Sequence, residues 1–237
     1  MNSTASPILV ALATYNEIDN LPSLVPAIRQ QVPSADLLVV DDKSPDGTGR
    51  WCAQWAAQHS WFHVIHRSGK QGLGTAARVA IDFAIRQDYP WLVTMDADWS
   101  HDPQDLPTLL EASGHCDVVV GSRYCKGGKI EGWPWHRRLI SRLLNKTSCY
   151  LLKLPVGDAS GAFRAYRVAR LGQLPRDQLR SAGYSYLEEL LWYLKRASAT
   201  FIEVPIVFRE RRGGRSKADL HELWGKLTTI AQLAFRR

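Results

Sequence analysis

Short apolar runs alternate with longer stretches of helical periodicity along the first half of the chain. The strand-like runs occupy residues 8–13, 36–40, 62–66, 91–95 and 117–120. Apolar residues at helical spacing fill the segments between them, at residues 21–31, 50–58, 75–87 and 104–113. Consecutive parallel strands need a crossover of about this length, usually a helix. The pattern therefore predicts an α/β fold in which helices cover both faces of a mostly parallel central sheet.

The pattern changes after Gly121. The later segments are a Gly- and Trp-rich loop, a helix, a second helix, a strand and a helical apolar face, at residues 124–135, 136–153, 184–195, 200–207 and 217–235. On the first of these helices, Arg138, Arg142 and Lys146 form a basic stripe beside apolar residues. Such a helix suits a membrane surface, and its spacing fits core packing with a solvated basic side equally well. The last segment can pack on the domain, lie on a membrane or meet a partner's helix.

The net charge of +7 conceals two halves of opposite sign. Residues 1–122 hold 7 Lys and Arg against 14 Asp and Glu, whereas residues 123–237 hold 23 against 9. We therefore expect one domain over residues 1–237, with an acidic half for a nucleotide and a metal and a basic half for an anionic partner. That partner is a phosphate, a membrane surface or a nucleic acid. For any single basic residue, a solvated surface charge remains the simpler interpretation.

The rest of the composition is that of an ordinary globular protein. The chain has 237 residues, of which 45% are hydrophobic, so it can bury a sizeable core. Its four cysteines show no metal-ligand spacing, which favours reduced thiols in the cytoplasm. No apolar run approaches the roughly 18–20 residues that span a bilayer, so we expect a soluble or peripheral protein.

Two of the predicted strands end in paired carboxylates. Asp96 and Asp98 follow the run at 91–95, and Asp41 and Asp42 follow the run at 36–40. Ligands of open α/β sheets bind at the carboxyl ends of the strands. Carboxylates are hard oxygen ligands that suit Mg²⁺ or Mn²⁺ bridging a diphosphate. A lone Asp-x-Asp is more often a solvated turn, but the second acidic strand end makes that interpretation much weaker.

Other site types do not match. The Gly-rich loop at 69–74 lacks the spacing of a phosphate-binding P-loop, and no Gly-x-Gly-x-x-Gly follows the first strand. The sequence also lacks a nucleophile elbow and a His-Glu-x-x-His zinc helix. Nucleotide hydrolases of the P-loop type, Rossmann-type dinucleotide enzymes and these two hydrolase classes are therefore disfavoured.

An ordered set of motifs resembles the family 2 glycosyltransferases of the GT-A fold. The motifs are TYNE at 14–17, VVDDKSPDGT at 39–48, DADWSH at 96–101 and GSRY at 121–124. Two later segments, DASGAFRAYR at 158–167 and RRGGRSK at 211–217, are similar to the dolichyl-phosphate mannose synthases, also called polyprenol monophosphomannose synthases. Each motif is weak alone, but the set covers roughly residues 8–217 in order and is highly specific.

The resemblance implies an inverting transfer of mannose from GDP-mannose to dolichyl or polyprenyl phosphate, assisted by Mg²⁺ or Mn²⁺. The product is a β-linked polyprenyl phosphate mannose. The alternative within this class is a polyprenyl-phosphate glucosyltransferase, or another transferase that uses a UDP-sugar. A scaffold that keeps the fold without turnover and a nucleic-acid-binding protein are rivals from other classes. The intact motifs argue against the scaffold, and no nucleic-acid motif is present, so we expect no nucleic-acid partner.

The resemblance also assigns residues to the donor site. It implies nucleotide-sugar binding by Ala13, Tyr15, Glu17, Val40, Asp42, Asp96, Ala97, Asp98, Arg123, Arg211 and Lys217. In this set, Tyr15 and Glu17 are expected to hold the base and the ribose. Tyr15 offers an aromatic face, and Glu17 accepts hydrogen bonds from hydroxyl groups. Ala13 stands where the family often has proline.

Metal ligands and catalytic groups follow from the same motifs. Asp96, Asp98 and Ser100 match the cation ligands, although a hydroxyl is a weaker ligand than the glutamine of some relatives, and His101 is expected to support them. The resemblance implies catalytic roles for Asp98, Arg123 and Arg211. Arginine suits this work because its planar fork can bind phosphate through two hydrogen bonds.

The resemblance also implies that the acceptor phosphate binds at Arg123, Arg137 and Ser141. The last two lie one helical turn apart in the helix at 136–153. Asp158 is a candidate for orienting the sugar or the acceptor-site arginines, or alternatively a helix or turn cap. No general base is required, because the second pKa of a phosphate monoester is ~6 and the acceptor oxygen is already anionic at pH 7.

Relatives carry a membrane span or rely on small membrane subunits. This chain ends at Arg237, soon after its last amphipathic segment. We therefore expect a cytoplasmic protein that binds the cytoplasmic face of a membrane peripherally, directly or through a small membrane subunit.

Overall fold

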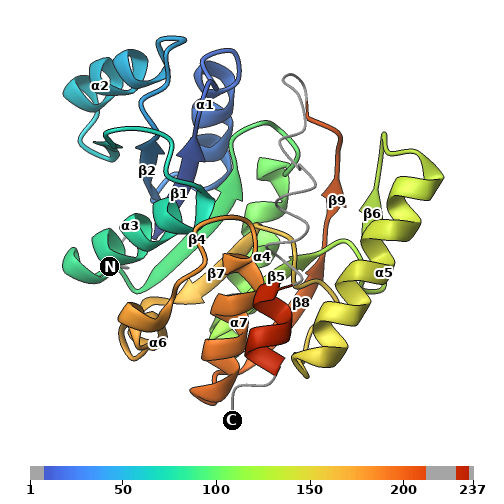
Figure 1. Cartoon of the computed structure of the whole chain (residues 1–237). Helices are drawn as coiled ribbons and strands as arrows, with labels where there is room; N and C mark the ends of the chain where they lie inside the picture. The colour runs from blue at the N-terminus through green and yellow to red at the C-terminus, as the bar shows by residue number, and fades with distance from the viewer. Residues whose placement is uncertain (1–7, 212–227, 235–237) are drawn as a thin grey trace.

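The computed structural model describes residues 8–211 and 228–234. Its main sheet has seven strands in the order β3-β2-β1-β4-β7-β5-β8 (Figure 1). In chain order they are β1 (Leu9–Thr14), β2 (Asp36–Asp41), β3 (Phe62–His66), β4 (Trp91–Asp96), β5 (Val118–Ser122), β7 (Arg164–Arg167) and β8 (Phe201–Pro205). Neighbours pair in parallel except at β7, which runs antiparallel to both β4 and β5. The predicted α/β fold with a mostly parallel central sheet is confirmed.

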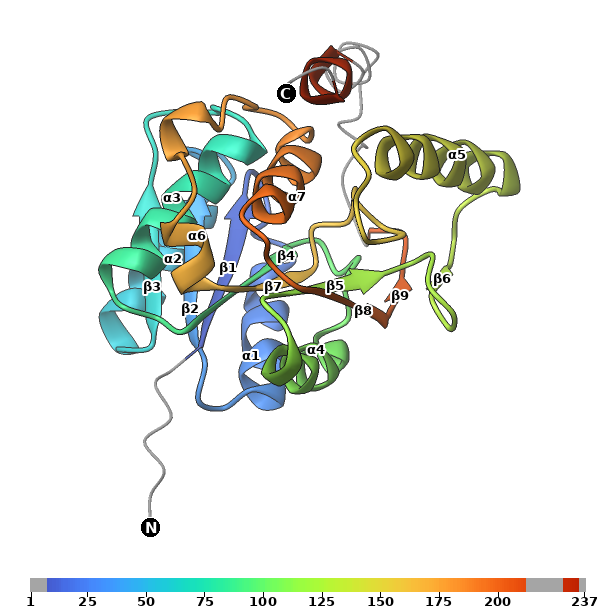
Figure 2. The ribbon, with the colours of Figure 1, turned by 90° about the horizontal axis from the view of Figure 1, so that it is seen from below.

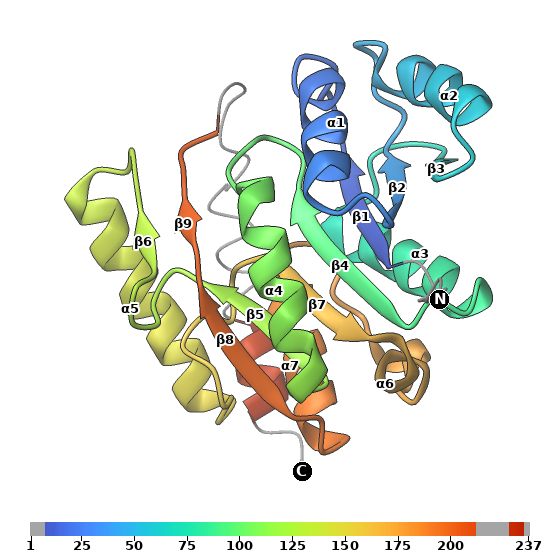
Figure 3. The same ribbon diagram turned by 180° about the vertical axis from the view of Figure 1, so that it is seen from behind.

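Helices cover both faces of the sheet because successive strand residues point to opposite sides. The covering helices are α1 (Leu21–Gln31), α2 (Thr48–Gln58), α3 (Leu73–Arg86), α4 (Leu106–Ala112), α6 (Val168–Gly172) and α7 (Tyr186–Arg196). Leu9 and Ala11 of β1 belong to the core that includes α3 and α7, whereas Val10 and Leu12 belong to the core that includes α1 and α4. The edge-on view in Figure 2 shows α3 and α7 on one face and α1 and α4 on the other. From behind, α4 lies across β5, β7 and β8 (Figure 3).

Several predicted boundaries were wrong. The segment expected as one helix at 104–113 is a short 3-10 turn, η1 (Pro103–Asp105), then α4, then a second 3-10 turn, η2 (Ser113–His115); a third, η3 (Arg176–Gln178), precedes α7. The strand expected at 200–207 divides into β8 and β9 (Val207–Phe208). The loop expected at 124–135 contains β6 (Lys129–Ile130), which pairs with β9 in a separate two-stranded sheet.

Helix α5 (Trp135–Leu151) stands beside the sheet rather than on it (Figure 2). Only Asn145, Ser148 and Cys149 of this helix are buried. Its large apolar side chains are open to solvent, with exposed fractions from 46% at Leu151 to 81% at Tyr150. Core packing, one of the two interpretations of this amphipathic segment, is therefore wrong for most of its apolar residues. Among the described helices, none has the length and apolar composition needed to cross a membrane.

The described part of the last segment packs on the domain. Residues 228–234 are helical, and Ile230 and Leu233 are buried in the core cluster that contains α7. Thr229 Oγ1 lies 3.4 Å from Ser185 Oγ, just before α7. Of the three interpretations of this segment, packing on the domain is confirmed for these residues. Residues 217–227 and residue 235 of the predicted helix lie outside the described part of the chain.

Candidate active site

A cavity of about 590 Å³ opens where β1 and β4 end. Its walls come from the loop after β1, the start of α3, the end of β4, the inner side of α5 and the segment after β9. The cavity brings together most residues assigned from the sequence. Those on its wall are Ala13, Tyr15, Glu17, Asp42, Asp96, Ala97, Asp98, Arg123, Arg137 and Arg211.

The loop that carries Tyr15 is held in place by the loop after β2. Side chains of Ser44, Thr48 and Asp46 accept hydrogen bonds from the backbone N–H groups of residues 16–18, at 2.9, 3.0 and 3.1 Å. These three residues alternate in the SPDGT stretch of the sequence, where each can reach back to the neighbouring loop. The motif therefore shapes the cavity without lining it.

Asp42 is fixed at the same end of the cavity by two partners. Its carboxylate pairs with the Arg67 guanidinium and accepts a hydrogen bond from Gln71 N at 3.3 Å. Lys70 Nζ lies 5.2 Å from the centre of the Tyr15 ring. This end of the cavity therefore offers a carboxylate, an ammonium group and an aromatic ring, which together suit a nucleoside.

Two carboxylates meet at the end of β4. The backbone N–H of Ser100 donates to Asp98 Oδ1 at 3.0 Å, and Arg211 Nε lies 3.7 Å from Asp98 Oδ2. Burial and the nearby Asp98 carboxylate raise the pKa of Asp96 well above its ordinary value. Like charges held this close favour a bound cation, because it stabilises both ionised carboxylates.

His101 is buried next to this acidic pair and holds the backbone of Asp96. Its Nδ1 accepts a hydrogen bond from Asp96 N at 3.1 Å, and its ring stacks on Phe163 with centroids 5.2 Å apart. Burial lowers the pKa of His101 to about 4, so the ring is neutral at pH 7. The supporting role expected for His101 fits this geometry.

A buried ion pair positions Arg123. Its Nε and Nη2 donate to the two oxygens of Asp158 at 2.7 Å each, and its backbone N–H donates to Asp158 Oδ2 at 3.0 Å. Burial opposes ionisation of Asp158, but the Arg123 guanidinium outweighs it and lowers the pKa of Asp158 to about 2. Asp158 also accepts hydrogen bonds from the backbone of Ser160 and Gly161. Of the roles that the sequence left open for Asp158, the structure shows two: Asp158 orients Arg123 and it caps a turn.

The far end of the cavity is built from α5 and the segment after β9. The Arg137 guanidinium lies 3.9 Å from the centre of the Trp133 ring, and its Nη1 donates to Glu210 Oε1 at 3.0 Å. Ile140 and Leu144 of α5 add apolar wall beside it. This end therefore combines one guanidinium with an apolar surface.

Three of the assigned residues that the structure describes are not on the cavity wall. Val40 is 1% exposed and packs in the core on the α3 side, because its strand position points it inward. Ser100 is buried behind Asp98. Ser141 does not line the cavity, and its Oγ forms a hydrogen bond with Tyr124 OH at 2.8 Å. Lys217 lies outside the described residues.

Sequence reasoning missed one wall of the cavity, the contact between residues 72–74 and residues 181–184. Gly74 N donates to Ala182 O at 2.8 Å. A Cβ at Gly72, which has φ +94°, would lie 2.4 Å from Ala182 O, so only glycine fits there. The Gly-x-Gly spacing is the sequence signal of this close approach. Nothing in the sequence indicates that the backbone approached by Gly72 is that of Ala182, 110 residues later.

The fold and the cavity define a glycosyltransferase of the GT-A class. The sequence model of glycosyl transferase family 2 matches residues 9–174. The chain therefore belongs to glycosyltransferase family 2.

Two relatives match over most of their length. Undecaprenyl-phosphate mannosyltransferase of Micrococcus luteus is 41% identical over 210 residues, which cover 89% of this chain and 86% of that protein. Polyprenol monophosphomannose synthase of Mycolicibacterium smegmatis is 38% identical over 230 residues, which cover 96% and 87%. A crystal structure of glucosyl-3-phosphoglycerate synthase from Mycobacterium tuberculosis, with Mn²⁺, uridine diphosphate and its product, aligns with a TM-score of 0.64 at 20% identity, covering 96% of this chain and 78% of that one. This last likeness concerns the fold.

Proposed function

We propose that this chain transfers mannose from GDP-mannose to the phosphate of a dolichyl or other polyprenyl lipid, with inversion at the anomeric carbon. The observation that carries the proposal is the single cavity that joins the acidic pair at the end of β4 to the guanidinium groups of Arg123, Arg137 and Arg211. The names of the two relatives support the choice of sugar and of a polyprenyl phosphate acceptor.

The acidic pair fits a divalent cation. Asp96 and Asp98 supply carboxylate oxygens, and the Ser100 hydroxyl is buried beside them. No cluster of three or more His, Cys, Asp or Glu side chains suited to a metal occurs in the described part of the chain. Two carboxylates suit Mg²⁺, or Mn²⁺ in its place, because such ions are commonly held by one or two carboxylates together with substrate phosphates. When bound, the cation supplies charge neutralisation for the departing diphosphate.

The remaining chemistry belongs to the guanidinium groups. Arg211 stands beside Asp98, where it can bind the diphosphate, and Arg123 is held rigidly by Asp158 between the two ends of the cavity. Arg137 stands at the apolar end, where a lipid phosphate arrives with its chain against α5. The acceptor oxygen is anionic at pH 7 because the second pKa of a phosphate monoester is ~6. These residues therefore bind and orient two anions, and no protein base is needed.

A test of the acceptor offers GDP-mannose with three molecules: a polyprenyl phosphate, the matching polyprenol without phosphate, and inorganic phosphate. The proposal expects labelled lipid only from the polyprenyl phosphate. Transfer to the free alcohol would contradict a phosphate nucleophile. Transfer to inorganic phosphate at a similar rate would contradict recognition of the lipid chain.

We also propose that α5 lies on the cytoplasmic face of a membrane. Trp135, Leu139 and Leu143 are more than half exposed, beside the basic residues of the same helix. Amphipathic helices with this combination bind the interface of anionic bilayers. Purified protein should therefore sediment with vesicles. If the purified chain does not bind vesicles without another protein, the exposed face of α5 would instead be assigned to contact with a small membrane subunit.

Replacing Arg137 with alanine should raise the KM for polyprenyl phosphate about tenfold or more, because a charge-assisted hydrogen bond contributes about 1.5–3 kcal/mol. The KM for GDP-mannose should change little. Arg138→Ala is the matched control, because Arg138 is the next residue of α5, is exposed and does not line the cavity. Equal effects of the two substitutions would contradict a phosphate site at Arg137.

Replacing Glu210 with glutamine should lower the KM for polyprenyl phosphate, and by less than Arg137→Ala raises it. In the structure Glu210 holds the Arg137 guanidinium that we assign to the acceptor phosphate. Both side chains are partly exposed, at 36% and 50%, and such pairs contribute about 0.2–1 kcal/mol. The KM for polyprenyl phosphate should therefore fall by up to about fivefold. An increase would mean that Glu210 orients Arg137 instead of competing for it.

A further inference from the structure

A second cavity, of about 810 Å³, opens on a different face of α5 from the active site. Its wall combines the outer and C-terminal part of α5 with the segment that follows it, residues 151–157. Asn145 joins the two, because its side-chain amide donates to Gly157 O and its Oδ1 accepts from Ala159 N at 2.9 Å. The cavity is therefore a fixed groove formed by α5 and a segment tied to it.

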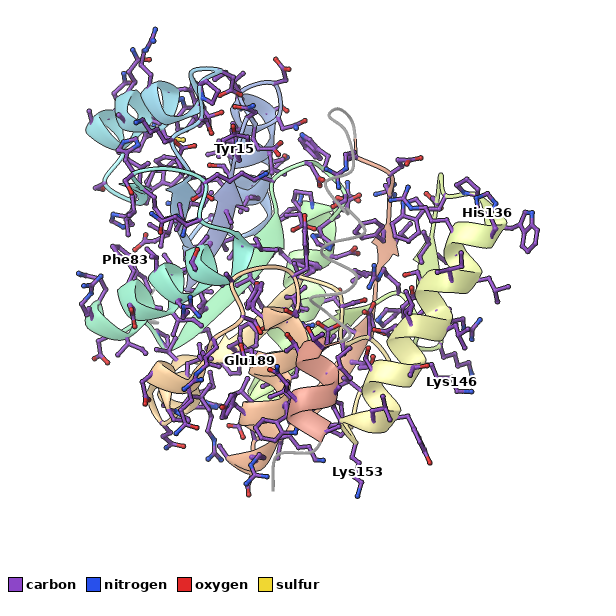
Figure 4. All side chains as sticks on the ribbon, in the orientation of Figure 1. Tyr15, Phe83, His136, Lys146, Lys153 and Glu189 are labelled. Atoms are coloured by element: carbon purple, nitrogen blue, oxygen red, sulfur yellow. The ribbon has the colours of Figure 1, made fainter. Side chains whose placement is uncertain are left out.

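Three cations line this groove and no carboxylate does. The cations are Arg142 and Lys146 of α5 and Lys153 just beyond it. Figure 4 shows Lys146 along the lower part of α5 and Lys153 past its end. Among the described residues, no carboxylate forms an ion pair with any of the three. Glu203 lies behind the groove, but its two oxygens already accept the backbone N–H groups of residues 157 and 158.

Apolar surface adjoins the cations. Leu154 and Val156 form part of the groove wall, and Tyr150 and Leu151 lie at its rim with exposed fractions of 81% and 46%. A ligand that matches this surface carries a negative charge next to a hydrophobic portion. Inorganic phosphate would use only the cations, and a hydrocarbon would leave them unpaired.

We propose that this groove binds an anionic phospholipid of the membrane, with its headgroup phosphate at Arg142, Lys146 and Lys153. The proposal rests on the proposed function in one respect: α5 lies against a bilayer, so the groove faces lipid. The site is distinct from that of the acceptor, whose phosphate we assign to Arg123 and Arg137 in the first cavity.

One side chain separates the two sites. Tyr124 lines the groove, its hydroxyl is bonded to Ser141, and its ring centre lies 5.2 Å from the Arg123 guanidinium carbon. A lipid in the groove would pack against the same ring that supports Arg123. Anionic lipid is therefore expected to increase the transfer rate as well as membrane binding.

The test uses the full chain and dihexanoylphosphatidylglycerol below its micelle concentration, so that a single lipid molecule reports on a site and not on surface charge. Binding is followed by calorimetry without nucleotide sugar. We expect saturable binding of one lipid per chain. The double variant Lys146→Gln/Lys153→Gln should weaken it about tenfold or more, given about fivefold for each cation near an anionic lipid. Arg138→Gln, an exposed cation of α5 outside the groove, should leave it unchanged.

Other outcomes overturn the proposal. Absence of saturable binding, or equal loss with Arg138→Gln, would leave only a solvated basic surface. A third outcome is that inorganic phosphate binds as tightly as the lipid and loses its affinity in the same double variant. That result would indicate an ion site without lipid recognition. Displacement by a short polyprenyl phosphate would assign the groove to the acceptor. Because no sugar donor is present, failure of the transfer reaction would not affect this result, and the melting temperature of each variant shows whether it is folded.

Discussion

Replacing Asp98 with asparagine is expected to lower the rate of sugar transfer by about 10²–10³-fold, the effect typical of losing one electrostatic contact at developing charge. Asparagine keeps the shape of the side chain and an oxygen that can accept the hydrogen bond from Ser100 N. The substitution removes one of the two carboxylates that we assign to the cation, and the ion pair with Arg211. It also removes a charge that raises the pKa of Asp96, so Asp96 should ionise more readily.

Two measurements separate this effect from damage to the fold. The melting temperature of Asp98→Asn should stay close to that of the parent chain, and its affinity for Mn²⁺ should fall when measured by water-proton relaxation. Asp102→Asn is the matched control, because Asp102 lies in the same loop but pairs with the partly exposed Arg209 away from the cavity wall. Transfer at a near-normal rate by Asp98→Asn would contradict the assignment of the acidic pair.

Replacing Asp158 with asparagine is expected to lower the free energy of unfolding by about 3–5 kcal/mol, because it leaves a buried guanidinium without its counter-ion. Arg123 and Asp158 have side-chain exposures of 6% and 0%, so water cannot replace the lost partner. Transfer should fall as well, because Arg123 keeps at most one of the two hydrogen bonds that fix its orientation. Denaturant unfolding and steady-state kinetics measure the two effects.

A double variant distinguishes an unpaired charge from a lost contact. Arg123→Met/Asp158→Leu removes both charges, and it should recover much of the stability but none of the activity. Asp102→Asn should cost no more than about 1 kcal/mol, since its pair with Arg209 is partly exposed. A double variant that is as unstable as Asp158→Asn alone would contradict the electrostatic explanation.

The same pair makes stability depend on pH at the acid end. The pKa of Asp158 is about 2 in the fold, against an ordinary value of 3.8. Because the folded pKa is the lower one, the stabilisation is fully present above about pH 4 and is lost as the pH falls through about 2. Asp158→Asn should therefore flatten the acid limb of a plot of unfolding free energy against pH.

The sequence predicted the sheet where strands are apolar and missed the strand that is not. β1, β2 and β4 are largely apolar runs that end in polar loops. The strands themselves, and the position of a cavity at their carboxyl ends, could therefore be predicted. β7 reads Arg-Ala-Tyr-Arg, which is not the pattern of a buried strand. Arg164 is nevertheless fully buried, because its guanidinium donates to the carbonyls of Ala159 and Leu187. Ala159 precedes β7 by a few residues, but Leu187 comes from α7, and local periodicity does not predict either contact.

The site shows the same division. Asp96 and Asp98 were predictable because their place is fixed by the strand that precedes them. Arg137 and Ser141 are one turn apart and share a face of α5, but Arg137 lines the cavity whereas the Ser141 hydroxyl is hydrogen-bonded to Tyr124. The rotation of the helix is set by Asn145 and Cys149, which face the domain. Side-chain spacing fixes neighbours on a helix, whereas tertiary packing fixes which neighbour faces the site.

Transfer of mannose from GDP-mannose to a lipid phosphate can be measured directly as lipid-phase label from a panel of sugar donors. The purified chain, a short polyprenyl phosphate and Mg²⁺ or Mn²⁺ are given labelled GDP-mannose, UDP-glucose or UDP-N-acetylglucosamine in separate reactions. We expect labelled lipid from GDP-mannose alone, and we expect EDTA to abolish the label. Label from a UDP-sugar alone would contradict the assigned donor, and label that survives EDTA would contradict the role of the acidic pair.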